Sequence, residues 1–188
     1  NAHIPVWGTY VTTPTATKEF AKVNVRTQIV LLEGADAGKY SVKTSVWNPN
    51  GQKLTEQTIP LSQIKYNDNS LSQEFIIQTP TLWSPDMPAL YSAETRLYEG
   101  DQLKDIYTTP FGIRSIEIIP NKGFFLNGEK TVFKGVCNHH DLGPLGAAVN
   151  DAAIRRQIRI LKDMGCNAIR TSHNMPAPEL VRACDEMG

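Results

Sequence analysis

The spacing of apolar residues changes once along this chain, near Pro120, and the change limits the folds that it can adopt. Before Pro120, short stretches alternate between apolar and polar residues, and turn-forming residues separate them roughly every 8 to 12 residues. Residues that share one strand face are Val23, Val25, Thr27 and Ile29, and then Tyr40, Val42, Thr44 and Val46. Further strands are expected at 6–12, 72–78, 91–99 and 104–107, and Asn50-Gly51 predicts a two-residue turn into a strand through Thr58. About seven strands without a long helix predict an immunoglobulin-like β-sandwich over residues 1–117.

After Pro120 the pattern alternates between strands and helices. Asn127-Gly128 predicts a short hairpin, and residues 131–136 and 167–170 predict strands. A helix capped by Asn150 or Asp151 and ended by Gly165 is expected between them, with Ile154, Ile158 and Leu161 on its apolar face. A second helix starts at Pro178 and places Leu180, Val181, Cys184 and Met187 on one face. Strand, helix, strand, helix predicts parallel pairing in a second domain, residues 118–188, of a mainly β chain.

The composition excludes several classes of partner. The 188 residues include 19 Lys plus Arg and 19 Asp plus Glu, without a basic stripe, which argues against nucleic acid and anionic membrane surfaces. No apolar run approaches the roughly 20 residues of a membrane span. Cys137, Cys166 and Cys184 form an odd set without a CxxC pair, so we expect free thiols buried as small apolar groups. The sequence does not decide between cytoplasm and periplasm.

Polar residues gather where the two parallel strands are expected to end. The first strand is followed by Asn138, His139, His140 and Asp141, and the second ends in Arg170, Thr171, Ser172, His173 and Asn174. In parallel β/α architecture such ends meet in one cleft, and these side chains suit sugar hydroxyls. A metal site from His139, His140, Asp141 and His173 is the alternative, but neighbouring residues of an extended segment point to opposite sides. We therefore expect no metal site, and no catalytic role for Cys137.

Four segments of the chain carry a resemblance to a known family. GFFLNGEKTVFKGVCNHHD at 123–141 and IRTSHN at 169–174 resemble the start of the catalytic TIM barrel in family 2 glycoside hydrolases, with bacterial β-galactosidases the most similar. LWSPDMPALY at 82–91 and FGIRSIE at 111–117 resemble the closing strands of that family's immunoglobulin-like domain and its entry to the barrel. The resemblance implies a fragment: a sandwich followed by the first two β/α units of an incomplete TIM barrel, which needs eight units.

The resemblance also implies an activity and site residues. The parent would be a retaining exo-glycosidase that hydrolyses terminal β-D-galactosides, with catalytic glutamates on later barrel strands, so that this chain carries no catalytic residue and is inactive alone. His139 and His173 match residues that contact the terminal sugar, Arg170 matches an arginine that orders the catalytic carboxylates, and Asn138 belongs to the same substrate-binding set. No cofactor is implied for the fragment, and the resemblance leaves room for a divalent cation in the full enzyme.

Several alternatives stay open at this stage. Many relatives carry Asn-Arg-His-Glu or Asn-Lys-His-Glu where this chain has Cys137 to His140, so the parent could also be a β-glucuronidase or a β-mannosidase. A noncatalytic carbohydrate-binding or interaction module is the competing class. The expected partner is a β-galactoside or related oligosaccharide, and an open barrel edge would favour self-association.

Overall fold

The computed structural model describes residues 2–63 and 70–188, which form two compact units. The sandwich unit comprises Asn1–Leu82 and Leu90–Ser115. The strand–helix unit comprises Trp83–Ala89 and Ile116–Gly188. Each unit has hydrophobic clusters of its own, and each is described separately below.

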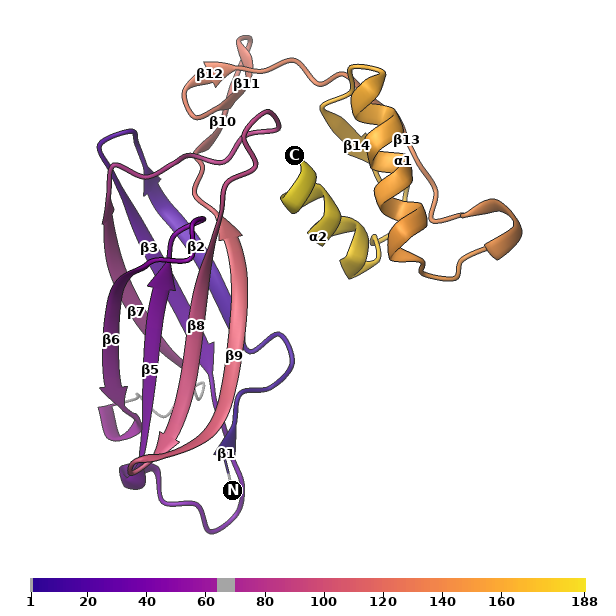
Figure 1. Ribbon diagram of the computed structural model, residues 1–188. Helices are drawn as coiled ribbons and strands as arrows, with labels where there is room; N and C mark the ends of the chain where they lie inside the picture. Colours follow the sequence, from indigo (N-terminus) through magenta and orange to yellow (C-terminus); the bar gives the residue numbers. More distant parts are fainter. Residues whose placement is uncertain (1, 64–69) are drawn as a thin grey trace. The chain divides into compact units, whose positions relative to one another are not determined.

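The sandwich unit is built from two antiparallel sheets (Figure 1). One sheet has the order β2-β3-β7, formed by Thr9–Ala16, Phe20–Gln28 and Ser70–Gln78. The other has the order β6-β5-β8-β9, formed by Lys53–Pro60, Tyr40–Trp47, Leu90–Glu99 and Gln102–Gly112. Short strands β1 (Ala2–His3) and β4 (Val30–Leu31) pair separately, and single 3-10 turns lie at Ala37–Lys39 and Leu61–Gln63. The predicted sandwich is confirmed.

The alternation of apolar residues places the sandwich core as expected. Val23, Val25 and Thr27 on β3 are fully buried, as are Val42, Thr44 and Val46 on β5. Because every second side chain of a strand points to the same face, these residues meet those of the opposite sheet. One cluster joins Val25 and Phe75 to Val46 and Ala93, and a second joins Ile29 and Leu71 to Val42 and Leu97.

A buried polar contact also links the two sheets. Gln73 of β7 is almost fully buried, and its Oε1 accepts a hydrogen bond from Thr44 Oγ1 of β5 at 2.6 Å. Its Nε2 donates to the carbonyl of Gln57 on β6 at 3.0 Å. Both ends of the amide therefore have partners, which offsets the desolvation that burial costs.

The loop at Asn50-Gly51 differs from the predicted two-residue turn. Trp47 pairs with Lys53, so the loop has five residues, and of the two central residues only Gly51 has a positive φ, at 77°. Asn48 closes the loop, because its Oδ1 accepts hydrogen bonds from the backbone N–H groups of Asn50 and Gln52. The leading strand is also later than predicted: it starts at Thr9, after a turn at Val6 and Trp7.

The strand–helix unit follows the predicted order. A three-stranded antiparallel sheet of β10 (Ile116–Ile119), β11 (Gly123–Leu126) and β12 (Glu129–Lys130) comes first. Strand β13 (Gly135–Cys137), a 3-10 turn (Gly143–Leu145) and helix α1 (Asp151–Asp163) follow it. Strand β14 (Ala168–Arg170) and helix α2 (Pro178–Met187) complete it. Asn150 is the N-cap of α1, accepting a hydrogen bond from the backbone of Ala153, and Gly165 with φ 85° follows its end.

Two expectations for this unit are wrong in detail. Residues 131–134 are not part of a strand, because β13 starts only at Gly135. On α2 the fully buried residue is Ala183, whereas Val181 is 47% exposed. Ala183 packs with Ile154 and Ile158 of α1, and Leu180, Cys184 and Met187 surround that contact as expected.

Within the segment 82–91, only Leu90 and Tyr91 lie in a strand, at the start of β8. Trp83–Ala89 is irregular and belongs to the strand–helix unit, where Trp83 Nε1 donates to the carbonyl of Asp185 at 2.8 Å. Lys162 of α1 donates through Nζ to the carbonyl of Pro85 and to the last carbonyls of α2. The segment thereby holds the carboxyl end of α2, whose final carbonyl groups have no partners within the helix.

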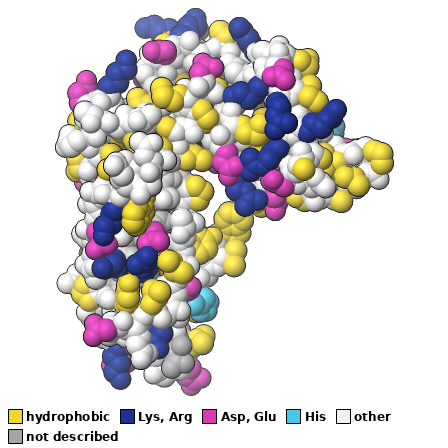
Figure 2. Space-filling model, viewed as in Figure 1, with side chains coloured by type: hydrophobic (Ala, Val, Ile, Leu, Met, Phe, Trp, Pro, Cys, Tyr) yellow, Lys and Arg dark blue, Asp and Glu magenta, His cyan; other side chains and the backbone are white. Residues whose placement is uncertain are grey.

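The surface agrees with the balanced charge. Figure 2 shows Lys and Arg side chains mixed with Asp and Glu on the face that it presents, without a large area of one sign. In the described parts of the chain, neither helix is long and apolar enough to span a membrane.

We predict that Glu56 on β6 makes the sandwich unit sensitive to acid. Its carboxylate accepts a hydrogen bond from Ser45 Oγ at 2.7 Å and lies 3.1 and 3.2 Å from the Nζ atoms of Lys53 and Lys43. These contacts lower the pKa of Glu56 to about 2. The folded pKa lies below the unfolded one, so the stabilisation is present at neutral pH and is lost as the pH falls from about 4.5 towards 2.

Urea denaturation at pH 7 and pH 3 measures this effect. Because the carboxylate is about a third exposed, Glu56→Gln should lower the free energy of unfolding at pH 7 by no more than about 1 kcal/mol, and by less at pH 3. Glu74→Gln is the control, since Glu74 lies 3.6 Å from Lys22 and is 57% exposed. An equal loss at both pH values for Glu56→Gln would contradict the prediction.

Candidate sugar-binding site

The site is organised by the parallel pairing of β13 with β14. Gly135 pairs with Ala168 and Cys137 with Arg170, and the backbone N–H of Asn138 continues the ladder by donating to the carbonyl of Arg170 at 2.9 Å. A Cβ atom on Gly135 would lie 2.2 Å from the carbonyl oxygen of Ala168. Only glycine therefore allows the strands to approach this closely.

Asn167 fixes the entry to this pair of strands. Its Oδ1 accepts a hydrogen bond from the backbone N–H of Lys134 at 2.8 Å, and its Nδ2 donates to the carbonyl of Val132 at 3.1 Å. Its own backbone N–H donates to the carbonyl of Lys134 at 2.8 Å. The side chain thus takes the hydrogen bonds that a longer β13 would have made. This role of Asn167 leaves no signal in the sequence, because an Asn before a short strand carries no distinctive pattern.

The two faces of the strand pair have different surroundings. Val136 and Ile169 are partly buried, and Ile169 packs against the α1 and α2 cluster. Cys137 and Arg170 lie on the opposite, exposed face, where Arg170 Nη1 donates to Cys137 Sγ at 3.8 Å. One face is therefore packing surface, and the other is available for a ligand.

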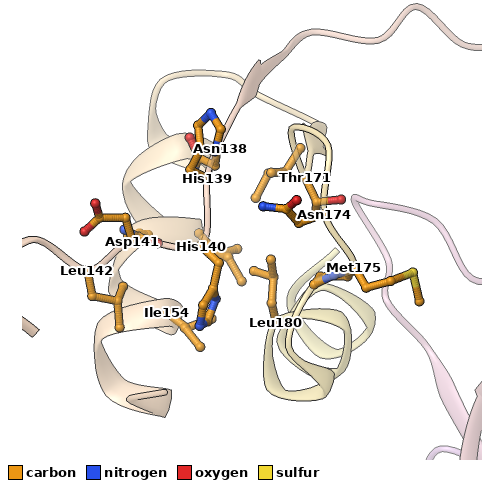
Figure 3. Close-up of a pocket in the computed structure, with 14 residues that line it drawn as sticks. Asn138, His139, His140, Asp141, Leu142, Ile154, Thr171, Asn174, Met175 and Leu180 are labelled. Atoms are coloured by element: carbon orange, nitrogen blue, oxygen red, sulfur yellow. The ribbon is translucent and has the colours of Figure 1, made fainter. Parts of the chain in front are cut away.

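The two neighbouring histidines after β13, His139 and His140, follow the same alternation. The rings of His139 and His173 are exposed, with centroids 5.4 Å apart at an angle of 77°, so the two strand ends bring them together. His140 turns the other way, and its Nε2 lies 2.9 Å from the carbonyl oxygen of Ala147, an acceptor to which the ring donates. Figure 3 shows the His140 ring directed towards Ile154 and the His139 ring directed the opposite way. His140 therefore points away from His139, as alternation along an extended segment predicts, and its ring makes a hydrogen bond to the backbone.

Behind His140 lies a small cavity between the strand ends and the helices. Its lining includes Asn138, His140, Ile154 and Leu180, and His139 also borders it (Figure 3). Its volume of about 30 Å³ holds a water molecule or two and is too small for a sugar ring. A sugar would therefore have to meet the exposed face that carries His139, His173 and Arg170.

The structure brings three of the four predicted substrate-binding residues onto that face. The fourth residue, Asn138, is half-buried and lines the small cavity. Its contact with Arg170 is a backbone hydrogen bond between the two strands. Between Arg170 and His173 the chain bends sharply at Ser172, which is buried and has φ 25°. A positive φ at a residue other than glycine is unusual and is found mostly where a functional segment is held in place. No sequence pattern signalled this bend.

The remaining sequence hypotheses concern metals and thiols. Among residues 2–63 and 70–188, no three His, Cys, Asp or Glu side chains are grouped as a metal site would need. All three cysteines are free, as expected, but Cys137 is exposed, contrary to the expectation that it is buried. It points to the ligand-facing side because it follows Val136 on the strand. Burial raises the pKa of the Cys184 thiol, and Asp185 adds to the effect.

Polar groups at the carboxyl ends of parallel strands, backed by helices, define the class of β/α enzymes that bind ligands at those ends. Residues 2–114 match the family described as glycosyl hydrolases family 2, and residues 117–188 match the TIM barrel domain of the same family. The chain belongs to glycosyl hydrolase family 2.

Individual relatives agree with this assignment. The chain is 42% identical over 186 residues to "Beta-galactosidase BoGH2A" of Bacteroides ovatus, covering 99% of this chain and 22% of that protein. It is 36% identical to a "Putative beta-glucuronidase" of Formosa agariphila, covering 95% of this chain and 16% of that protein. A crystal structure of a family 2 member from Bacteroides cellulosilyticus superposes with a TM-score of 0.91 at 38% identity, over 100% of this chain and 24% of that one. The chain thus spans about a fifth of the length of these proteins.

We predict that Asn167→Ala loosens the strand pair. The substitution removes two hydrogen bonds and leaves the backbone groups of Lys134 and Val132 without these partners, which costs about 1–3 kcal/mol. Hydrogen exchange measured by mass spectrometry should show faster exchange in residues 132–138 and 168–171. Asn174→Ala, an exposed asparagine in the same unit, is the control and should leave these rates unchanged. Unchanged exchange in Asn167→Ala would contradict the assigned role.

We also predict that the three thiols react at different rates. Cys137 is exposed, whereas Cys166 and Cys184 are partly buried and the pKa of Cys184 is raised by burial. Alkylation of the native chain at pH 8, followed by peptide mass spectrometry, should label Cys137 first and Cys184 slowly. Under denaturing, nonreducing conditions all three should be labelled. Preferential native labelling of Cys184, or a disulfide between any two, would contradict this order.

Proposed function

We propose that this chain carries part of the sugar-binding site of a retaining exo-glycosidase that hydrolyses terminal β-D-galactosides. The observation that carries the proposal is the pairing of His139 with His173 on the exposed face at the carboxyl ends of β13 and β14. Membership of glycosyl hydrolase family 2 and the relative named as a β-galactosidase support it.

In this proposal each residue has a distinct role. The imidazoles of His139 and His173 hydrogen-bond to hydroxyl groups of the terminal sugar, with bonds that tighten as charge develops on the ring in the transition state. Arg170 lies on the same face and orders the catalytic carboxylates of the complete enzyme. The Arg170 guanidinium donates through Nη1 to Cys137 Sγ at 3.8 Å, which helps to fix its position.

The acid/base and the nucleophile lie outside this chain in the proposal. Retaining hydrolysis requires two carboxyl groups roughly 5 to 5.5 Å apart across the scissile bond. The family resemblance assigns both groups to glutamates on later barrel strands. Three carboxylates of this unit already have partners: Asp141 accepts a hydrogen bond from the backbone of Gly143, and Asp151 and Glu186 pair with Arg155. We therefore propose that the 188-residue chain alone hydrolyses no glycoside.

A β-glucuronide is the second candidate substrate, because the relative from Formosa agariphila is named a putative β-glucuronidase. A glucuronide carries a carboxylate, for which a free cation would be the expected partner. Arg170 is an exposed cation at the end of β14, on the strand that leads to His173. The contact of Arg170 with Cys137 favours a fixed, positioning role for it, and therefore the neutral galactoside.

The test is the activity of the complete protein. With nitrophenyl β-galactoside, β-glucuronide and β-mannoside as substrates, we expect the highest kcat/KM for the galactoside. His139→Ala and His173→Ala should each lower kcat/KM by roughly 30- to 150-fold, corresponding to about 2–3 kcal/mol for a hydrogen bond to a charged transition state. His140→Ala should cost much less, because its ring bonds to the backbone of Ala147.

Three outcomes would contradict the proposal. Equal losses for the three histidine variants would mean that the sugar-facing pair is assigned wrongly. A higher kcat/KM for the β-glucuronide would mean that the substrate is a glucuronide and that the galactoside is assigned wrongly. Turnover by the 188-residue chain that survives repurification would overturn the placement of both catalytic carboxylates outside it.

A further inference from the structure

A second hollow lies on the sandwich unit, and none of its lining residues is used in the proposed function. It has a volume of about 350 Å³ and is lined by Trp7, Gly8, Tyr10, Arg26, Gln28 and Ser70. Its residues come from the turn before β2 and from the outward-facing sides of β2, β3 and β7. We call it the aromatic depression.

The turn that carries Trp7 is fixed by the backbone. The N–H of Gly8 donates to the carbonyl of Pro5 at 2.8 Å, and the N–H of Gln28 donates to the carbonyl of Gly8 at 2.7 Å, which ties the turn to the end of β3. A Cβ on Gly8 would lie 2.6 Å from Pro5 O. Trp7 itself has φ 62°, a conformation that costs a bulky residue about 1–2 kcal/mol. The indole of Trp7 is therefore exposed to solvent in a turn whose backbone is strained.

The second aromatic ring stands on the neighbouring strand. Tyr10 pairs in register with Arg26, so the two side chains share one face of the sheet, and Arg26 Nε donates to Ser70 Oγ at 2.9 Å. Among the described residues, Trp7 and Tyr10 are the most exposed aromatic side chains, at 73% and 66%. Large aromatic side chains exposed around a hollow mark a binding surface, because solvent contact of this area is unfavourable.

The chemistry of the lining points to one kind of ligand. Aromatic rings pack against the C–H face of a pyranose, while the amide of Gln28 and the hydroxyl of Tyr10 match sugar hydroxyl groups. Nucleic acid is disfavoured, since Arg26 is the one cation among the described residues of the lining and phosphate recognition takes several. We propose that the aromatic depression is a noncatalytic binding site for a short neutral oligosaccharide.

Titration calorimetry on the 188-residue chain tests the proposal. Cello-, xylo- and manno-oligosaccharides, which carry no terminal galactose, are the probes, and at least one should bind. Trp7→Ala should weaken that binding roughly tenfold or more, and Tyr10→Ala should weaken it several-fold, as expected for aromatic anchors. Ile76→Ala is the matched control, because Ile76 is an exposed apolar residue on the outward face of β7 outside the depression. His139→Ala separates this site from the proposed glycosidase site, and both control variants should bind within twofold of the unchanged chain.

Folding of each variant is checked by circular dichroism and thermal melting, and Trp7→Phe, which keeps an aromatic ring, should retain part of the affinity. Absence of binding to every probe at millimolar concentration would overturn the proposal. So would binding that His139→Ala abolishes and Trp7→Ala spares. Conversion of a dimer to a monomer by Trp7→Ala, with unchanged sugar binding, would assign the rings to a second copy of the chain and equally overturn it.

Discussion

The close approach of β13 to β14 is the constraint on which the candidate site depends. Parallel pairing at Gly135 and Ala168 sets the register, and the register determines which side chains reach each face. With Cys137 opposite Arg170, the next residues of the same parity are His139 on one strand and Ser172 on the other, and the bend at Ser172 returns His173 to the face of His139. A side chain at Gly135 would separate the strands and move the histidines apart.

The bend at Ser172 explains why alternation alone does not build the site. A regular strand would place Arg170 and His173 on opposite faces, because their separation is an odd number of residues. The hydrogen bond from the N–H of Ser172 to the carbonyl of Arg170 at 2.9 Å tightens the chain, and Ser172 is buried in the turn. The uncommon backbone conformation of Ser172 thus places His173 on the face of His139, which regular alternation along a strand would not do. Such strain is typical of segments that position functional groups.

Much of the fold can be predicted from the sequence, because burial of regularly spaced apolar side chains determines most of its strands and helices. Burial of alternate residues on β3 and β5 predicts their inward faces, and the spacing of Ile154 and Ile158 predicts the face of α1. The errors arise where side chains replace backbone pairing. Asn167 takes the hydrogen bonds expected of a strand at 131–134, Asn48 lengthens a predicted two-residue turn, and Trp83 binds the end of α2 instead of joining the sandwich. None of these contacts leaves a periodic pattern in the sequence.

The two units hold the exposed groups of their proposed sites in different ways. In the sandwich unit two clusters of buried side chains and the Gln73 amide fix the sheets, so a strained turn at Trp7 can be maintained on a rigid support. In the strand–helix unit the buried cluster consists of Ile154, Ile158 and Ala183, and polar contacts carry more of the positioning. Asn167 holds the strand entry, His140 holds the loop after β13, and Lys162 holds the end of α2. Each of these contacts depends on a single side chain. Replacing one of them can therefore change the positions of His139 and His173 while the apolar core stays unchanged.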